Sequence, residues 1–144
     1  MLDLASRLHH MGFCVEALER PEAMRRWSDW CRSFCEIVKA SEGRYTRRGL
    51  HWHAFAEGLV PSISGHAARR QYLQIEPETF FVVPENWSTG FGVRAAGAAM
   101  PDLTFLTNDL YVFPESLEWT MVFTHEAGYG PYFTRREWCS VPPG

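Results

Sequence analysis

The sequence predicts a single α+β domain over residues 1–144, with an antiparallel or mixed sheet and a C-terminal meander packed against a long helix. Three observations predict this fold class. The length of 144 residues is typical of one domain. Apolar residues recur at helical spacing through residues 21–39. Residues 110–134 hold short apolar runs separated by turn residues, which is typical of a meander.

The composition excludes two broad classes. Hydrophobic residues make up 46% of the chain and aromatic residues 15%, which is too much apolar content for a disordered chain. No apolar run approaches the roughly 18 residues of a membrane span. The segment 1–4 lacks the basic region of a signal peptide. We therefore expect a cytoplasmic globular protein that does not act at a membrane.

The first half of the chain predicts three helices and two strands. A short helix over 3–11 ends at Gly12 and is followed by a strand over 13–18. Pro21 suits the start of the long helix. Alternating side chains predict a strand over 50–56, with His51 and His53 on one face. Ser64 is a candidate N-cap for a helix that runs to about Leu73.

The second half predicts only strands. The apolar run 79–83 indicates a buried strand, and Phe91 and Val93 indicate a short one. The meander then follows over 110–113, 119–125 and 131–134. In its middle strand the alternation places His125 on the same face as three apolar residues, namely Trp119, Met121 and Phe123.

Charge is divided unevenly along the chain. The net charge is −3, but residues 20–70 hold ten basic and five acidic side chains, whereas residues 76–126 hold eight acidic side chains and one arginine. Such asymmetry favours a charged partner. Because the chain as a whole is acidic, we expect no direct binding of nucleic acid, although Arg44, Arg47 and Arg48 lie near aromatic residues.

Cysteine, serine and glycine give no decisive catalytic or metal motif. The four cysteines (Cys14, Cys31, Cys35 and Cys139) are expected to be free thiols. Cys31 and Cys35 lie one helical turn apart and could supply half a zinc site, but a small core residue is the more usual role. Ser62 and Ser64 do not form a nucleophile elbow, and the glycines of 90–97 match no phosphate-binding loop.

The histidines together with the acidic residues are the group of side chains that comes closest to a catalytic site. His51 and His53 on one strand face would suit two metal ligands, with further ligands from His66, His125, Glu126, Asp102 or Asp109. Alternatively, His125 could form an acid–base pair with Glu126 or His53. A histidine beside aromatic residues on a sheet is more often structural, so we predict no catalytic residue, metal or cofactor.

Two sequence blocks carry a family resemblance. The segment Trp52-His53-Ala54-Phe55 and the C-terminal segments 119–126 and 130–133 resemble a family of small bacterial proteins catalogued only as a domain of unknown function. The motif positions are Trp52, His53, Trp119, Thr124, His125, Glu126, Gly130, Pro131, Tyr132 and Phe133. The resemblance implies no established activity. By analogy, such small proteins are similar to immunity partners of secreted bacterial toxins.

The leading interpretation is therefore a bacterial immunity protein that binds a cognate toxin and occludes it with an acidic, aromatic-rich surface. The predicted partner-binding residues are Asp102, Asp109, Tyr111, Glu115, Glu118, Glu126, Tyr129 and Tyr132. The alternative is a small metal-dependent or acid–base enzyme that uses His53, His125 and Glu126. A third interpretation is a dimer that hides exposed aromatic residues.

Overall fold

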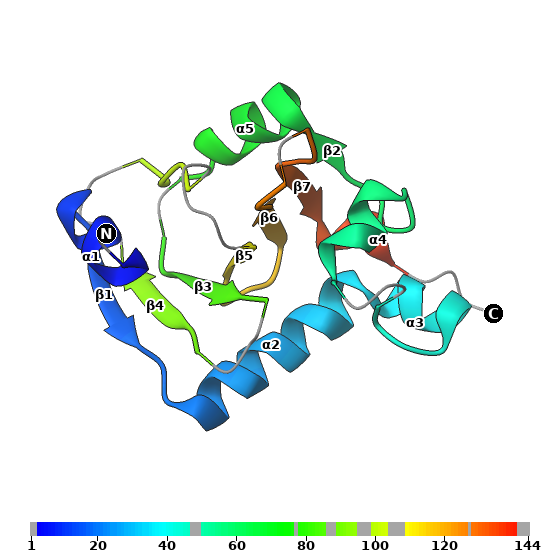
Figure 1. Cartoon of the computed structure of the whole chain (residues 1–144), viewed down its shortest axis with the longest axis horizontal. Coiled ribbons are helices and arrows are strands. Elements are labelled where there is room, and N and C mark those ends of the chain that lie inside the picture. The colour runs from blue at the N-terminus through cyan, green and yellow to red at the C-terminus, as the bar shows by residue number, and fades with distance from the viewer. Residues whose placement is uncertain are drawn as a thin grey trace.

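One antiparallel sheet organises the computed structural model, which describes residues 3–46, 50–76, 78–85, 89–94, 99–103, 109–126 and 128–140 (Figure 1). In these residues the strand order is β1-β4-β3-β5-β6-β7-β2. The strands are β1 (Cys14–Ala17), β2 (Ile63–Ser64), β3 (Phe80–Pro84), β4 (Phe91–Arg94), β5 (Leu110–Pro114), β6 (Trp119–Phe123) and β7 (Tyr132–Arg135). The predicted α+β class is confirmed.

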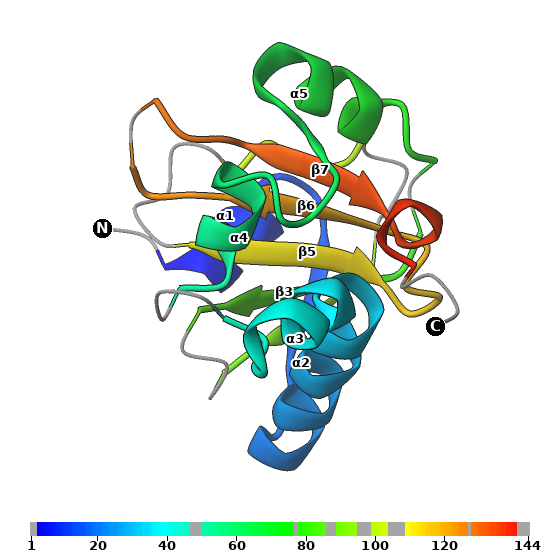
Figure 2. The same ribbon diagram turned by 90° about the vertical axis from the view of Figure 1, so that its right-hand side faces the viewer.

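The described helices lie on both faces of this sheet (Figure 2). None of them combines the length and the apolar content needed to cross a bilayer. Their bounds are α1 (Leu4–His10), α2 (Arg20–Phe34), α3 (Glu36–Glu42), α4 (Trp52–Ala56), α5 (Gly65–Leu73) and the 3-10 helix η1 (Arg136–Cys139).

The predicted meander forms the centre of the sheet. Strands β5, β6 and β7 pair antiparallel in chain order, with Leu110 opposite Phe123 and Val122 opposite Tyr132. Strand β3 joins the other side of β5 and places Pro84 opposite Leu110. Both β3 and β5 are therefore central strands, which explains their continuous apolar sequences.

Alternation along the strands divides the core into two clusters. Tyr111 and Phe113 pack with α2, α3 and α4 on one face, whereas Leu110 and Val112 pack with α1 and α5 on the other. A buried threonine sits on the first face: the Thr120 hydroxyl accepts the indole N–H of Trp30 at 2.9 Å and donates to the Val112 carbonyl at 2.8 Å.

Four local predictions differ from the structure. Strand β6 ends at Phe123, so His125 lies beyond it and does not share the buried face of Trp119, Met121 and Phe123. The long helix ends at Phe34, because Cys35 leaves the helical region with φ −116° and ψ 12°, and α3 continues from Glu36. The predicted strand over 50–56 is wrong, since this segment forms α4. Ser64 precedes α5 as expected, but its side chain makes no capping hydrogen bond.

Candidate functional site

Two carboxylates leave the sheet at the same end of neighbouring strands. Glu85 directly follows β3 and Asp109 directly precedes β5, and the backbone N–H of Glu85 donates to the Asp109 carbonyl at 3.2 Å. Each carboxylate binds one histidine through Nδ1: Glu85 binds His51 and Asp109 binds His125. The antiparallel pairing of β3 and β5 thus assembles two histidine–carboxylate pairs from four distant positions.

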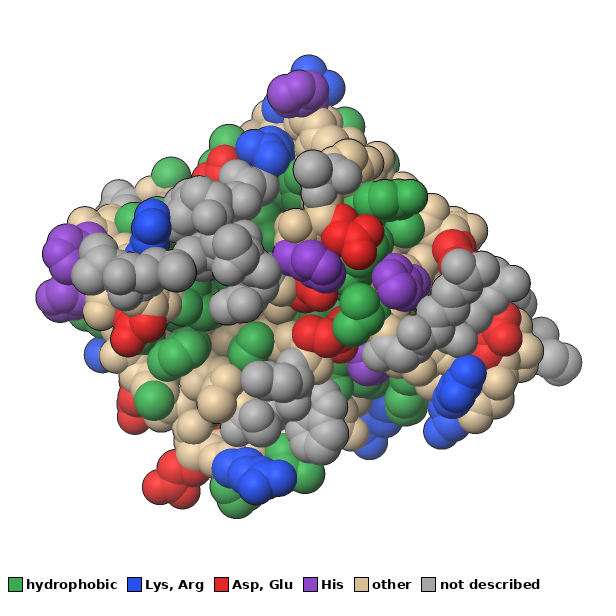
Figure 3. All heavy atoms as spheres, in the orientation of Figure 1, with side chains coloured by type: hydrophobic (Ala, Val, Ile, Leu, Met, Phe, Trp, Pro, Cys, Tyr) green, Lys and Arg blue, Asp and Glu red, His purple; other side chains and the backbone are tan. Residues whose placement is uncertain are grey.

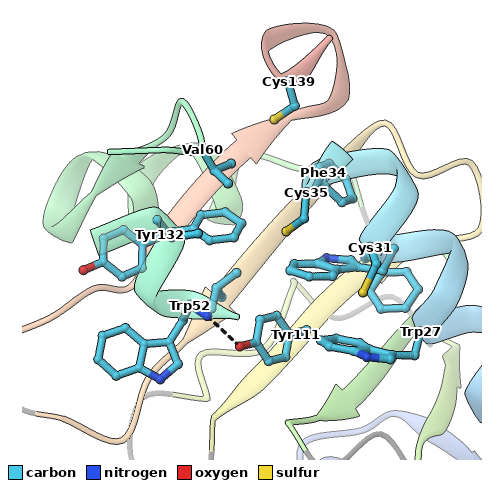
Figure 4. Packing of buried hydrophobic residues seen from close by; sticks show 14 of the residues in the cluster. Trp27, Cys31, Phe34, Cys35, Trp52, Val60, Tyr111, Tyr132 and Cys139 are labelled. Atoms are coloured by element: carbon cyan, nitrogen blue, oxygen red, sulfur yellow. Dashed lines mark hydrogen bonds between the residues drawn. The ribbon is translucent and has the colours of Figure 1, made fainter. Parts of the chain in front are cut away.

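Glu85 is the acceptor at the centre of the first pair. Its Oε2 accepts the Nδ1–H of His51 at 2.8 Å. Its Oε1 accepts both the backbone N–H of His51 at 2.9 Å and the hydroxyl of Tyr111 at 2.6 Å. The Tyr111 oxygen in turn accepts the backbone N–H of Trp52 at 3.0 Å (Figure 4). Burial, with the nearby Glu85 charge, raises the pKa of Tyr111 well above its usual value, so the hydroxyl stays protonated.

This network supplies the missing N-terminal cap of α4. The first amides of a helix have no partner within the helix. At the start of α4 they belong to His51 and Trp52, and the His51 side chain makes no cap bond. Glu85 and Tyr111 satisfy them from the sheet instead. The sequence prediction missed this helix because its cap comes from residues 34 and 59 positions away.

Asp109 orients the second histidine. Its Oδ1 accepts the backbone N–H of His125 at 2.8 Å and the imidazole Nδ1–H at 2.7 Å. The hydrogen bond to Asp109 raises the pKa of His125 above its usual 6.5, against a smaller opposing effect of desolvation. The His125 side chain remains 39% exposed, and its Nε2 lies 3.6 Å from Oε1 of Glu126. Nε2 is therefore the nitrogen presented to a partner or substrate.

The buried ring of Trp52, the first residue of α4, lies close to the turn after β6. The Trp52 ring lies 4.3 Å from His53, 5.7 Å from Tyr129 and 6.2 Å from His125, measured between ring centroids. Trp52 itself is only 1% exposed, whereas Tyr129 is 51% exposed. On this side of the molecule histidine, acidic and hydrophobic side chains gather together at the surface (Figure 3).

The predicted metal and acid–base sets assemble only in part. His125 pairs with Asp109, and Glu126 approaches its outer nitrogen. His53 meets Trp52, but its buried Nδ1 has no hydrogen-bond partner. In the described part of the chain no three His, Cys, Asp or Glu side chains converge on a position where they could hold a metal ion.

The cysteines are free thiols, as predicted. Burial raises the pKa of Cys31 to about 12 and that of Cys35 well above its usual value. Thiols that stay protonated are poor nucleophiles and poor metal ligands, so neither cysteine suits those roles.

The predicted partner-binding residues separate by exposure. Tyr111, Tyr132 and Asp109 are buried and cannot be surface anchors, which corrects that part of the prediction. The cause is the alternation of β5 and β7, which turns both tyrosines toward α2 and α4.

The remaining predicted acids are exposed or paired with arginine. Glu115 lies 3.6 Å from Arg26, and Asp102 lies 3.4 Å from Arg69. Glu118 and Glu126 are exposed, and so is Tyr129. Only Glu126 and Tyr129 lie on the turn after β6, whereas Glu115 and Glu118 lie on the turn between β5 and β6, at the opposite end of those strands.

The C-terminal motif builds the turn after β6 and part of the core beneath it. Gly130 has φ +78°, and a Cβ there would lie 3.2 Å from the Tyr132 ring and 3.3 Å from the Thr124 methyl group, so glycine is required. The Thr124 hydroxyl donates to the Tyr129 carbonyl. The motif aromatics Trp119 and Phe133 stack in the second core cluster.

The fold and site thus define a small single-sheet α+β protein with two oriented histidines at one end of its central strands. The chain belongs to the family described as Domain of unknown function (DUF4275), whose model matches residues 25–133. The predicted family resemblance is therefore confirmed. No curated protein and no solved structure matches the chain significantly.

Proposed function

We propose that the protein is a stoichiometric binding protein of the immunity type, which acts in the bacterial cytoplasm and neutralises a cognate toxin by covering a basic region of it. The observation that carries this proposal is the surface formed by His125, Glu126 and Tyr129, here called the Tyr129 patch. Tyr129 is exposed yet rests on the buried Trp52 ring.

The Tyr129 patch has the physical properties of a binding hot spot. Tyrosine is enriched at such positions because its large ring loses little conformational entropy on binding. The turn is braced before any partner arrives, since the Tyr129 N–H donates to the Glu126 carbonyl at 3.3 Å and its carbonyl accepts from Thr124. A rigid aromatic anchor beside an exposed carboxylate suits a partner with basic side chains.

The test is whether the protein binds the product of the neighbouring gene, as the candidate toxin, and protects cells from it. We expect the purified wild-type protein to bind the toxin and to protect cells that express it. Tyr129→Ala should weaken binding at least about 30-fold, the effect of a hot-spot residue. Leu73→Ala is the matched control, because Leu73 is 50% exposed on α5 and lies outside the patch.

Two results would count against the proposal in different ways. A wild-type protein that neither binds nor protects would exclude the immunity function. Binding that survives both Tyr129→Ala and the charge reversal Glu126→Lys would keep the function but move the interface elsewhere.

A second candidate, acid–base catalysis, is favoured by the Asp109–His125 geometry. A carboxylate on Nδ1 holds the ring with Nε2 as the proton acceptor, which is the arrangement of a general base. His125 also lines a cleft of about 690 Å³ with apolar walls that include Leu50, Phe91 and Leu110. In this candidate His125 is the catalytic base, Asp109 is a positioning residue, and His53 has no part.

Hydrolysis of p-nitrophenyl esters tests the catalytic candidate. We expect a rate that rises with pH through a His125 pKa above 6.5, because the neutral ring is the base. His125→Gln should abolish this profile, and Asp109→Asn should move its midpoint toward 6.5. A wild-type rate equal to that of His125→Gln would exclude the candidate.

A further inference from the structure

A second hollow opens beside α2, with a cavity volume of about 440 Å³. One face of α2 contributes Met24, Trp27 and Ser28, and the segment after α3 contributes Tyr45 and His51. The described lining carries no Lys, Arg, Asp or Glu side chain. The pocket is therefore suited to an uncharged ligand.

Its aromatic walls are held in place from behind. Trp27 stacks on the fully buried Trp30 with ring centroids 4.8 Å apart and planes 6° from parallel. Figure 4 shows Trp27 beside Tyr111 on the same side of the sheet. The Tyr45 hydroxyl donates to Oε2 of Glu36 at 3.1 Å, which holds the Tyr45 side chain in place. A ligand would meet preformed surfaces, which lowers the entropic cost of binding.

His51 is the oriented polar group of this pocket. Its ring stands at 80° to Trp27, with centroids 4.7 Å apart, so the two rings form a corner. Glu85 fixes Nδ1 as a hydrogen-bond donor, which leaves Nε2 of the neutral ring as an acceptor. No described residue donates to Nε2. A ligand that satisfies it must bring an O–H or N–H group.

We infer that this pocket binds a small planar aromatic molecule with one hydrogen-bond donor, of the phenol or indole class. The ring lies against Trp27 and the donor binds Nε2 of His51. The Glu85 carboxylate behind His51 disfavours an anionic ligand. This inference is independent of the toxin interface, because the Tyr129 patch contributes no residue to the pocket.

The test is an NMR titration with p-cresol that follows the Trp27 indole and the His51 imidazole. We expect saturable shifts at both rings. Toluene has the same ring without the hydroxyl and should bind about 2- to 10-fold more weakly, the effect of one hydrogen bond. Equal binding of toluene, or shifts that spare Trp27 and His51, would overturn the inference.

Two exposed positions on α2 give a matched pair of variants. Ser28→Phe fills the pocket from its rim and should weaken p-cresol binding at least tenfold. Arg25→Phe adds the same ring at an exposed position that does not line the pocket, and should leave binding unchanged. Thermal unfolding confirms that both variants are folded. Equal binding by the two variants would contradict the assigned location.

A final binding measurement distinguishes two sources of the ligand: a free small molecule and a side chain of a protein partner. N-acetyl-tyrosinamide carries the same phenol on a peptide backbone. Tighter binding of p-cresol supports a small-molecule ligand. Tighter binding of N-acetyl-tyrosinamide would assign the pocket to a partner's tyrosine and overturn the small-molecule assignment.

Discussion

The His51–Glu85 and His125–Asp109 pairs share one hydrogen bond, from Nδ1 to a carboxylate, but differ in exposure. In the first pair both side chains are largely buried, at 12% and 17% exposure, and Glu85 accepts three hydrogen bonds. In the second the carboxylate is buried while the histidine is 39% exposed. The first pair fastens a helix to the sheet and places His51 in the lining of the pocket beside α2, whereas the second leaves its histidine more exposed to solvent.

This comparison shows that the same hydrogen bond can serve different roles. Glu85 satisfies backbone and hydroxyl donors that burial would otherwise leave unpaired, and such groups are costly. Asp109 mainly orients a ring whose other nitrogen is exposed and lies 3.6 Å from Oε1 of Glu126. The following variants should separate the two roles, beginning with the largest expected effect.

Glu85→Ala should be the most destabilising change. It leaves the buried Tyr111 hydroxyl and the His51 N–H without their acceptor. We expect a loss of about 3 kcal/mol in the free energy of unfolding, measured with urea. Glu126→Ala is the control, since this exposed acid should change stability by less than about 0.5 kcal/mol. Similar losses in both variants would refute the distinction.

Tyr111→Phe should come second, with a loss of about 1–2 kcal/mol. It removes the hydroxyl that joins Glu85 to the Trp52 N–H but keeps the buried ring. Because both residues serve one network, the double variant with Glu85→Ala should lose less than the sum of the single losses. Additive losses in urea unfolding would show that the network is not coupled.

Asp109→Asn should have a smaller effect that depends on pH, about 0.5 kcal/mol for a partly exposed pair. The hydrogen bond raises the pKa of His125, so its stabilisation is complete below pH 6.5 and is lost as the pH rises through the folded-state pKa. The difference in stability between wild type and variant should therefore shrink at alkaline pH. A difference that grows there would contradict the assignment.

Glu126→Gln should have the smallest effect. Its charge is the last and weakest of the causes that raise the pKa of His125. We expect NMR titration of His125 to show a slightly lower pKa than in the wild type, and still above that of Asp109→Asn. A larger decrease than in Asp109→Asn would reverse the roles of the two carboxylates.

Sequence periodicity was sufficient to predict those helices and strands whose apolar residues mark one buried face. The meander and the start of the long helix follow from apolar spacing, because each strand or helix face must be buried somewhere. The same reasoning failed for residues 50–56. Alternation of apolar residues with His51 and His53 indicates a strand, but the cap that permits a helix lies in Glu85 and Tyr111.

The candidate site was predicted only in part. His125, Glu126 and Tyr129 were selected, whereas Glu85 was not, although one weak signal was present: an acid directly follows the apolar run of β3. Tyr111 was selected for the wrong reason, because a tyrosine in an apolar strand cannot be assigned to surface or core until the packing of both faces is known.

The sequence by itself determined the class of fold, the meander, the free thiols and the family. These depend on side-chain spacing and composition, which are local properties of the chain. Only the tertiary structure decided that β3 and β5 are neighbours, and hence that Glu85 and Asp109 leave the sheet together with a histidine on each. Strand pairing joins residues far apart in sequence, and it was that pairing which fixed the orientation of both imidazoles.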